Sequence, residues 1–163
     1  MSSGVPVKIG GPVVALGRLV QVSTEVPGIT AADAFDALDM FGQVFSLEVP
    51  RAGAIVKALY YDLDDENITK DLWIFSADPG TMPASDVAFS LTDAQSLLVV
   101  DVLTFSSFRD GINNRVGYTT DTPCWYMAPL GRLWFALQTP GADNIAAGSF
   151  PRVSLVIEKY ADD

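Results

Sequence analysis

Histidine is absent from the 163-residue sequence, and cysteine occurs only once, at Cys124. Without histidine, the chain cannot build a Ser–His or Cys–His catalytic pair or a histidine-ligated metal site. A single cysteine cannot form an intrachain disulfide, and the neighbouring Pro123 and Trp125 favour a buried, unreactive thiol. We therefore expect no catalytic residues, no cofactor and no metal site.

Carboxylates are another class of catalytic group. Asp36, Asp39, Glu48 and Asp101 lie near apolar stretches but form no recognisable motif. A carboxylate pair that hydrolyses glycosides is defined by a separation in space, which the sequence does not give. This possibility stays open at the level of sequence, although our expectation is that the protein is not an enzyme.

Positive charge is scarce, because 10 Lys and Arg residues face 20 Asp and Glu residues, for a formal net charge of −10. The basic residues are scattered singly along the chain. Proteins that bind nucleic acid cluster their cations, which displace counterions from the phosphates. We expect no nucleic acid among the partners of this protein.

Long hydrophobic runs are also missing, since no stretch reaches the roughly 18 apolar residues of a membrane span. The most apolar early segment, Val13–Val22, is interrupted by Gly17, Arg18 and Gln21, and no cleavage-site pattern follows it. The sequence therefore predicts no membrane association and no secretory signal. We expect the chain to fold in the cytoplasm of the cell that makes it.

Apolar residues are plentiful overall, at 49% of the sequence, whereas charged residues make up only 18% and the mean hydropathy is +0.27. A chain of this length forms one domain and buries about 70% of the surface that its unfolded form exposes. The apolar surplus over the needs of the core indicates surface that neighbouring subunits cover. We expect self-association.

The chain is organised around residues 54–77. Two apolar, aromatic-rich runs, Ile55–Tyr61 and Leu72–Ala77, flank an acidic turn, Asp62–Asn67. This pattern predicts a β-hairpin or a pair of neighbouring strands. Because both runs are apolar at nearly every position, we place the pair in the middle of a sheet with at least one face covered.

Further strands are predicted where apolar and polar residues alternate or where short apolar runs lie between turn signals. The predicted strands are 13–23, 43–49, 97–105, 115–120, 123–129, 132–138 and 152–158. We expect loops at 79–90, 106–114 and 139–149. Many short strands separated by turns indicate an all-β antiparallel sandwich, jelly-roll-like by first choice and immunoglobulin-like by second.

One or two short helices complete this prediction. Thr92–Gln95 fits a single helical turn capped by Ser90 or Thr92. Residues 29–42 fit either a helix, capped by Thr30 and ended by Gly42, or a loop that leads into the next strand. We divide the chain into an N-terminal arm and first strand (1–30) and the sandwich (31–163), within one domain overall.

The acidic turn has two possible interpretations. Its carboxylates, Asp62, Asp64, Asp65 and Glu66, are of the type that binds Ca²⁺. Read as an EF-hand loop, however, the segment has Asn67 instead of glycine at the sixth position and a tryptophan instead of glutamate at the twelfth. We therefore favour a solvated turn between two strands.

The aromatic residues also have two interpretations. Exposed rings could form a platform that stacks on sugars, but aromatic residues are also enriched in cores and subunit interfaces. We favour the core or an interface. The residues concerned are Tyr60, Tyr61, Trp73, Trp125, Tyr126 and Trp134.

Residues 33–160 resemble a group of tailed-bacteriophage virion proteins, the head decoration or cement proteins, which are jelly-roll-like structural proteins. The order and spacing of short strand-and-turn segments carry the resemblance. These segments are Asp33–Phe45, Arg51 and Gly53 followed by Ile55–Asp65, Asp71–Phe75 with Pro79, Ala88–Ala94, and Gly131–Leu137 followed by Arg152–Leu155. The proline-threonine-tyrosine-threonine motif that the family often has before its last strand is replaced here by Gly141–Gly148.

The resemblance implies a protein on the outer capsid surface of a virion, bound to the major capsid protein as a homotrimer and stabilising the shell. Alternatives are another virion component, such as a head-fibre base or a tail protein, and a carbohydrate-binding sandwich module. With the apolar surplus, the resemblance suggests an N-terminal arm within Val5–Val22 and a set of interface residues. These are Val5, Val7, Ile9, Val13, Leu16, Leu19, Phe105, Phe108, Trp125 and Tyr126.

Overall fold

The computed structural model describes residues 18–30, 34–146 and 148–160, and these form twelve strands and one short helix. The first six strands are β1 (Leu19–Glu25), β2 (Ala34–Phe35), β3 (Asp39–Glu48), β4 (Ala52–Asp62), β5 (Lys70–Phe75) and β6 (Val99–Phe105). The next six are β7 (Ser107–Asp110), β8 (Arg115–Tyr118), β9 (Cys124–Met127), β10 (Arg132–Thr139), β11 (Asp143–Asn144) and β12 (Arg152–Lys159). The helix is α2 (Asp93–Ser96).

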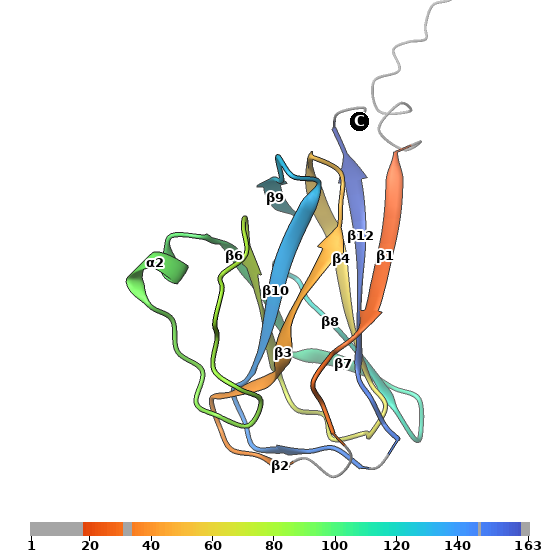
Figure 1. The fold of residues 1–163 in the computed structure, drawn as a ribbon. Helices are drawn as coiled ribbons and strands as arrows, with labels where there is room; N and C mark the ends of the chain where they lie inside the picture. The colour runs from red at the N-terminus through yellow and green to blue at the C-terminus, as the bar shows by residue number, and fades with distance from the viewer. Residues whose placement is uncertain (1–17, 31–33, 147, 161–163) are drawn as a thin grey trace, which may run out of the picture.

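Two antiparallel sheets pack face to face (Figure 1). Sheet I has the order β1-β12-β4-β8-β7, and β9 pairs with β4 beyond the end of β8. Sheet II has the order β3-β10-β5-β6, and β2 and β11 form a small separate pair. The predicted antiparallel β-sandwich is confirmed.

The core fills the space between the two sheets. In β10, Leu133, Phe135 and Leu137 are buried there, as the alternation in the sequence predicted. The ring of Phe135 stacks on Phe45 of the neighbouring β3, with 5.4 Å between the ring centroids. Strands of both sheets supply the remaining core side chains, among them Phe41, Ile55, Tyr60, Leu72, Ile74, Leu103, Phe105, Val153, Leu155 and Ile157.

A second apolar layer lies on the outer face of sheet II. Residues 76–98, which include α2, pass over this face and bury Met40, Phe75 and Ala136 completely. The backbone of this segment is hydrogen-bonded to β3, with Met40 N donating to Val87 O at 2.8 Å. Sheet II is therefore apolar on both faces, which explains why β5 is apolar at every position from Leu72 to Phe75.

The predicted hairpin at 54–77 is wrong. β4 belongs to sheet I and β5 to sheet II, so the acidic turn between them crosses from one sheet to the other. Both strands are interior strands of their sheets, as predicted. The error arises because an apolar run shows that a strand is buried but does not show which strand it pairs with.

Four other segments differ from their predictions. Of the two alternatives for residues 29–42, the helix is not formed; residues 34–42 form β2, a turn and the start of β3, which is closer to a loop that leads into the next strand. Met40 and Phe41 are buried on opposite faces of that strand. The predicted loop at 106–114 contains β7, and the predicted loop at 139–149 contains β11. Of the predicted strand 13–23, only residues 18–23 are described, and β1 begins at Leu19 and continues to Glu25.

The predicted helical turn at 92–95 is confirmed. Thr92 is the N-cap of α2: its hydroxyl accepts a hydrogen bond from Gln95 N, and the Gln95 side chain accepts one from Thr92 N. This reciprocal arrangement is a capping box. No helix within the described residues is long and apolar enough to cross a membrane.

Candidate docking surface at one end of the sandwich

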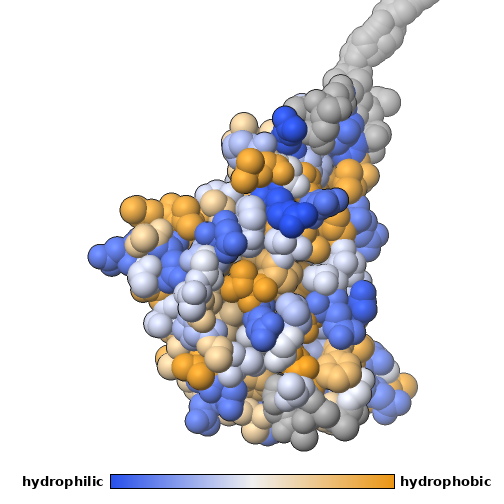
Figure 2. Space-filling view, in the orientation of Figure 1, coloured by the Kyte–Doolittle hydropathy of each residue, from blue (hydrophilic) through white to orange (hydrophobic). Residues whose placement is uncertain are grey.

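Large apolar side chains are exposed at the end of the sandwich where β9 lies, which we call the open end. Trp125 is 64% exposed, Met127 66% and Leu130 77%. Arg18 lies here too, because Lys159 N at the end of β12 donates a hydrogen bond to its carbonyl oxygen. Both the first described residue and the end of β12 are therefore at this end (Figure 1). In Figure 2, hydrophobic residues are visible there beside the grey atoms.

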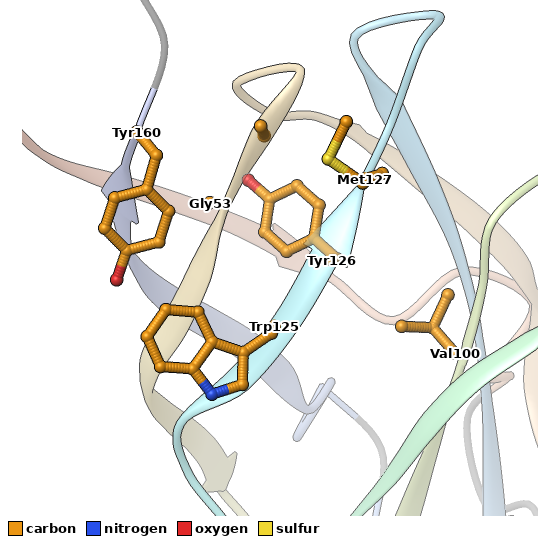
Figure 3. Close-up of a pocket in the computed structure, with 7 residues that line it drawn as sticks. Gly53, Val100, Trp125, Tyr126, Met127 and Tyr160 are labelled. Carbon is orange, nitrogen blue, oxygen red and sulfur yellow. The ribbon is translucent and has the colours of Figure 1, made fainter.

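An apolar groove of about 450 Å³ lies at the open end. The rings of Trp125 and Tyr160 form one side of it, stacked with centroids 5.4 Å apart and an interplanar angle of 18° (Figure 3). Met127 and Val100 also line it, and carbon atoms make up most of its surface. A groove with so few polar atoms suits an apolar partner better than a sugar, whose hydroxyls need hydrogen-bond partners.

The groove exists because β4 carries small residues where it pairs with β9. Ala54 lies opposite Trp125 in the pairing register, and Ala52 lies opposite Met127. Between them, Gly53 has no room for a side chain, since a Cβ there would lie 2.6 Å from the carbonyl oxygen of Glu158. Because the neighbouring side chains on β4 are small, Trp125 and Met127 project from the surface of the sheet.

β9 also presents a free strand edge. It pairs with β4 on one side, and no other strand of the described residues pairs with it on the opposite side. An exposed edge offers unpaired backbone N–H and C=O groups to another chain. The open end thus combines apolar side chains with a backbone that can extend the sheet.

The structure places the predicted interface residues in three groups. Leu19 and Trp125 are exposed at the open end. Phe105 and Tyr126 are buried in the core; Phe105 has no exposed surface, which argues against its place in an interface, whereas Tyr126 also lines the groove (Figure 3). Phe108 is half-buried and packs against the core. The remaining predicted residues, Val5, Val7, Ile9, Val13 and Leu16, lie outside the described residues.

Sequence reasoning missed Met127, Leu130 and Tyr160. Trp125 and Met127 are exposed while Cys124 and Tyr126 are buried. This is the period-two alternation of a strand. Applied to β9, the same rule would have paired Trp125 with Met127 and placed Tyr126 inside.

Cys124 is buried, as predicted. Burial, together with the nearby carboxylate of Asp101, raises the pKa of its thiol to about 12. The nucleophilic thiolate is therefore almost absent at neutral pH.

The opposite end of the sandwich, which we call the closed end, contains the acidic turn. Asp62 is buried, and its carboxylate accepts hydrogen bonds from the backbone N–H groups of Asp64 and Asn67. The predicted solvated turn is therefore wrong for Asp62. Within residues 18–30, 34–146 and 148–160, no group of three or more His, Cys, Asp and Glu side chains is placed to hold a metal ion.

A buried ion pair lies next to this turn. Lys70 Nζ is 2.6 Å from Asp143 Oδ2, and the two side chains are only 1% and 2% exposed. The ammonium also donates to the carbonyl oxygen of Ile68 and lies 4.7 Å from the centroid of the Phe41 ring. Burial lowers the pKa of Lys70 and raises that of Asp143, and their mutual attraction opposes both shifts. The pair is a structural link between β5 and β11.

The other candidate groups do not converge on one site. Asp39 and Glu48 stand at the two ends of the ten-residue β3, Asp101 lies on β6, and the Asp39 carboxylate accepts a hydrogen bond from Asp36 N. The aromatic residues are also dispersed. Trp73 and Trp134 lie in the apolar layer over sheet II, Tyr60 and Tyr126 in the core, Tyr61 on β4, and Trp125 at the open end.

Comparison of the chain with models of known protein families and with curated proteins gives no match.

Proposed function

We propose that this protein is a non-enzymatic virion component of a tailed bacteriophage, a decoration protein on the outer surface of the head. In this proposal it associates with copies of itself as a homotrimer and binds the major capsid protein. The observation that carries the proposal is the open end, where Trp125, Met127 and Leu130 remain exposed around an apolar groove.

The strand pairing supports this assignment. β1 pairs with β12, β3 with β10, β4 with β8 and β9, and β5 with β6. The chain is thus paired like one long hairpin that has been rolled into two sheets. We propose that this connectivity is that of a jelly roll. A jelly roll is the architecture implied by the resemblance of residues 33–160 to decoration proteins.

A second copy of the chain is the partner that we assign to the open end. The free edge of β9 allows backbone pairing between copies, and the flanking apolar side chains would be removed from water in the contact.

The test is binding of the purified protein to emptied, expanded heads of the phage that encodes it. We expect saturable binding in hundreds of copies per head, a rise in the temperature at which the heads rupture, and density for the protein on the outer surface by cryo-electron microscopy. A copy number in the tens or fewer would place the protein in a tail or fibre instead. Absence of the protein from virions would reject the proposal.

A further inference from the structure

A second groove, of about 350 Å³, lies on the outer face of sheet I and is chemically unlike the open end. β4 contributes Lys57 and Leu59, β7 contributes Arg109, and β8 contributes Tyr118. Thr122, which follows β8, also lines it. The volume is within the usual range for sites that bind small molecules, about 300–1,000 Å³.

The strand alternation explains why these side chains face outward together. Gly117 and Phe108 are partners in the pairing of β7 with β8, and a Cβ on Gly117 would lie 2.8 Å from the Phe108 ring. Since Phe108 packs against the core, both residues face inward. The adjacent Arg109 and Tyr118 must then face away from the core.

The charge of this groove is opposite to that of the protein as a whole. In the part of the chain that the structure describes, neither Lys57 nor Arg109 has a carboxylate within ion-pair distance, and no acidic residue lines the groove. Acidic residues outnumber basic ones two to one in the sequence. An acid-free groove with two unpaired cations therefore stands out from the remaining surface, and it favours an anionic ligand.

The arrangement is also ordered before a ligand arrives. The guanidinium of Arg109 lies over the Tyr118 ring, 5.8 Å from its centroid. This cation–π contact restricts the long side chain and leaves its N–H groups available. Arginine presents a planar fork of donors to an oxyanion, and lysine adds a point charge. Leu59 and Val116 supply an apolar surface next to these donors.

We propose that this groove binds a phosphorylated small molecule of about the size of a sugar phosphate. Two cations match the charge of roughly −1.5 to −2 on a phosphate monoester, whereas a single carboxylate would leave one cation uncompensated. The apolar surface and the hydroxyls of Tyr118 and Thr122 would contact the body of the ligand. This groove and the groove at the open end share no lining residue, so this proposal does not depend on self-association.

The experiment is a titration of ¹⁵N-labelled protein with glucose 6-phosphate at low salt, followed by NMR. We expect saturable shift changes on β4, β7 and β8. Lys57→Gln and Arg109→Gln should each weaken binding about tenfold or more, the effect of losing a hydrogen bond to a charged group. Arg51→Gln removes the same charge from an exposed arginine that does not line this groove, and should leave binding unchanged.

Titrations with three further ligands test which chemical groups the groove recognises. Glucuronate, with one carboxylate, and inorganic phosphate, with no organic body, should both bind more weakly than glucose 6-phosphate, and glucose should not bind. Equal binding of inorganic phosphate or of glucose would overturn the proposal. It would also be overturned by no saturation at millimolar ligand, by equal binding in the Lys57 and Arg109 variants, or by an effect of these variants on self-association alone.

Discussion

The two ends of the sandwich are built in contrasting ways. At the closed end, the strand connections cover the core, and their polar groups are bonded to one another: Asp62 accepts two backbone hydrogen bonds, and Ala146 N donates to Asp64 Oδ2. At the open end, the small residues of β4 leave Trp125 and Met127 standing above the sheet. The contrast separates an end that stabilises the fold from an end whose surface is available to a partner.

The outer faces of the two sheets differ in the same way, because one is covered and the other is exposed. Residues 76–98 cover sheet II and bury much of the apolar content that the sequence showed in excess. Sheet I has no such cover among the described residues and carries the cationic groove. Part of the apolar surplus therefore serves the fold itself, and part is exposed at the open end, on Leu19, Trp125, Met127, Leu130 and Tyr160.

The largest effect on stability should come from Lys70→Met at the closed end. This change leaves the buried Asp143 carboxylate without its partner, which typically costs about 3–5 kcal/mol. The free energy of unfolding in urea measures it. The control is Lys70→Met combined with Asp143→Leu, which should recover most of the loss because no buried charge remains. A single variant as stable as the wild type would contradict the role assigned to the ion pair.

A glycine at each end gives the next largest contrast. Gly53→Ala at the open end should cost about 1–3 kcal/mol, the usual cost of overpacking, because its Cβ would meet the backbone oxygen of Glu158. Gly141→Ala at the closed end should change stability little, since the nearest atom to its Cβ is 3.5 Å away. Thermal unfolding of the two variants tests this prediction. Equal losses would contradict the close approach of Gly53 to the backbone oxygen of Glu158.

Acidification should partly rescue the Lys70→Met variant. Burial raises the pKa of Asp143, and removing the ammonium takes away the strongest influence that lowers it. The folded-state pKa is then above the unfolded value, so stability is regained as the pH falls through the folded-state pKa, by at most about 1.4 kcal/mol per pH unit. Urea unfolding between about pH 8 and pH 5 tests the sign. A deficit that grows on acidification would contradict it.

The smallest effect on the stability of the monomer is expected for Trp125→Ala, measured at a protein concentration too low for self-association. An exposed side chain away from the core usually contributes within about ±0.5 kcal/mol. Trp73→Ala is the matched control, because Trp73 is packed on Phe89 in the covered layer and donates to Gln138. We expect a clear loss for Trp73 and almost none for Trp125 in urea unfolding. A larger loss of stability for Trp125→Ala than for Trp73→Ala would contradict the assignment of Trp73 to the fold and of Trp125 to a surface that is available to a partner.

The sequence was informative where one face of a strand is buried and the other is not. The alternation in β10 and β12 predicted their core residues, and the Thr92 cap predicted α2. The apolar runs of β4 and β5 gave no such information about pairing, so the hairpin was wrongly inferred.

The closed end and the open end were less predictable for different reasons. Lys70 is buried only because Asp143, far along the chain, pairs with it. No local pattern reports such a contact. At the open end, the apolar surplus and the resemblance predict both Trp125 and Tyr126 as interface residues, although adjacent strand residues face opposite ways.

The most direct test of the central claim is the sedimentation of the full chain at increasing concentration, compared with a variant that carries Trp125→Ser and Met127→Ser. We predict a concentration-dependent trimer for the wild type and a stable, folded monomer for the variant, because both substitutions are exposed at the open end. A wild-type protein that stays monomeric, or a variant that associates as the wild type does, would contradict the account.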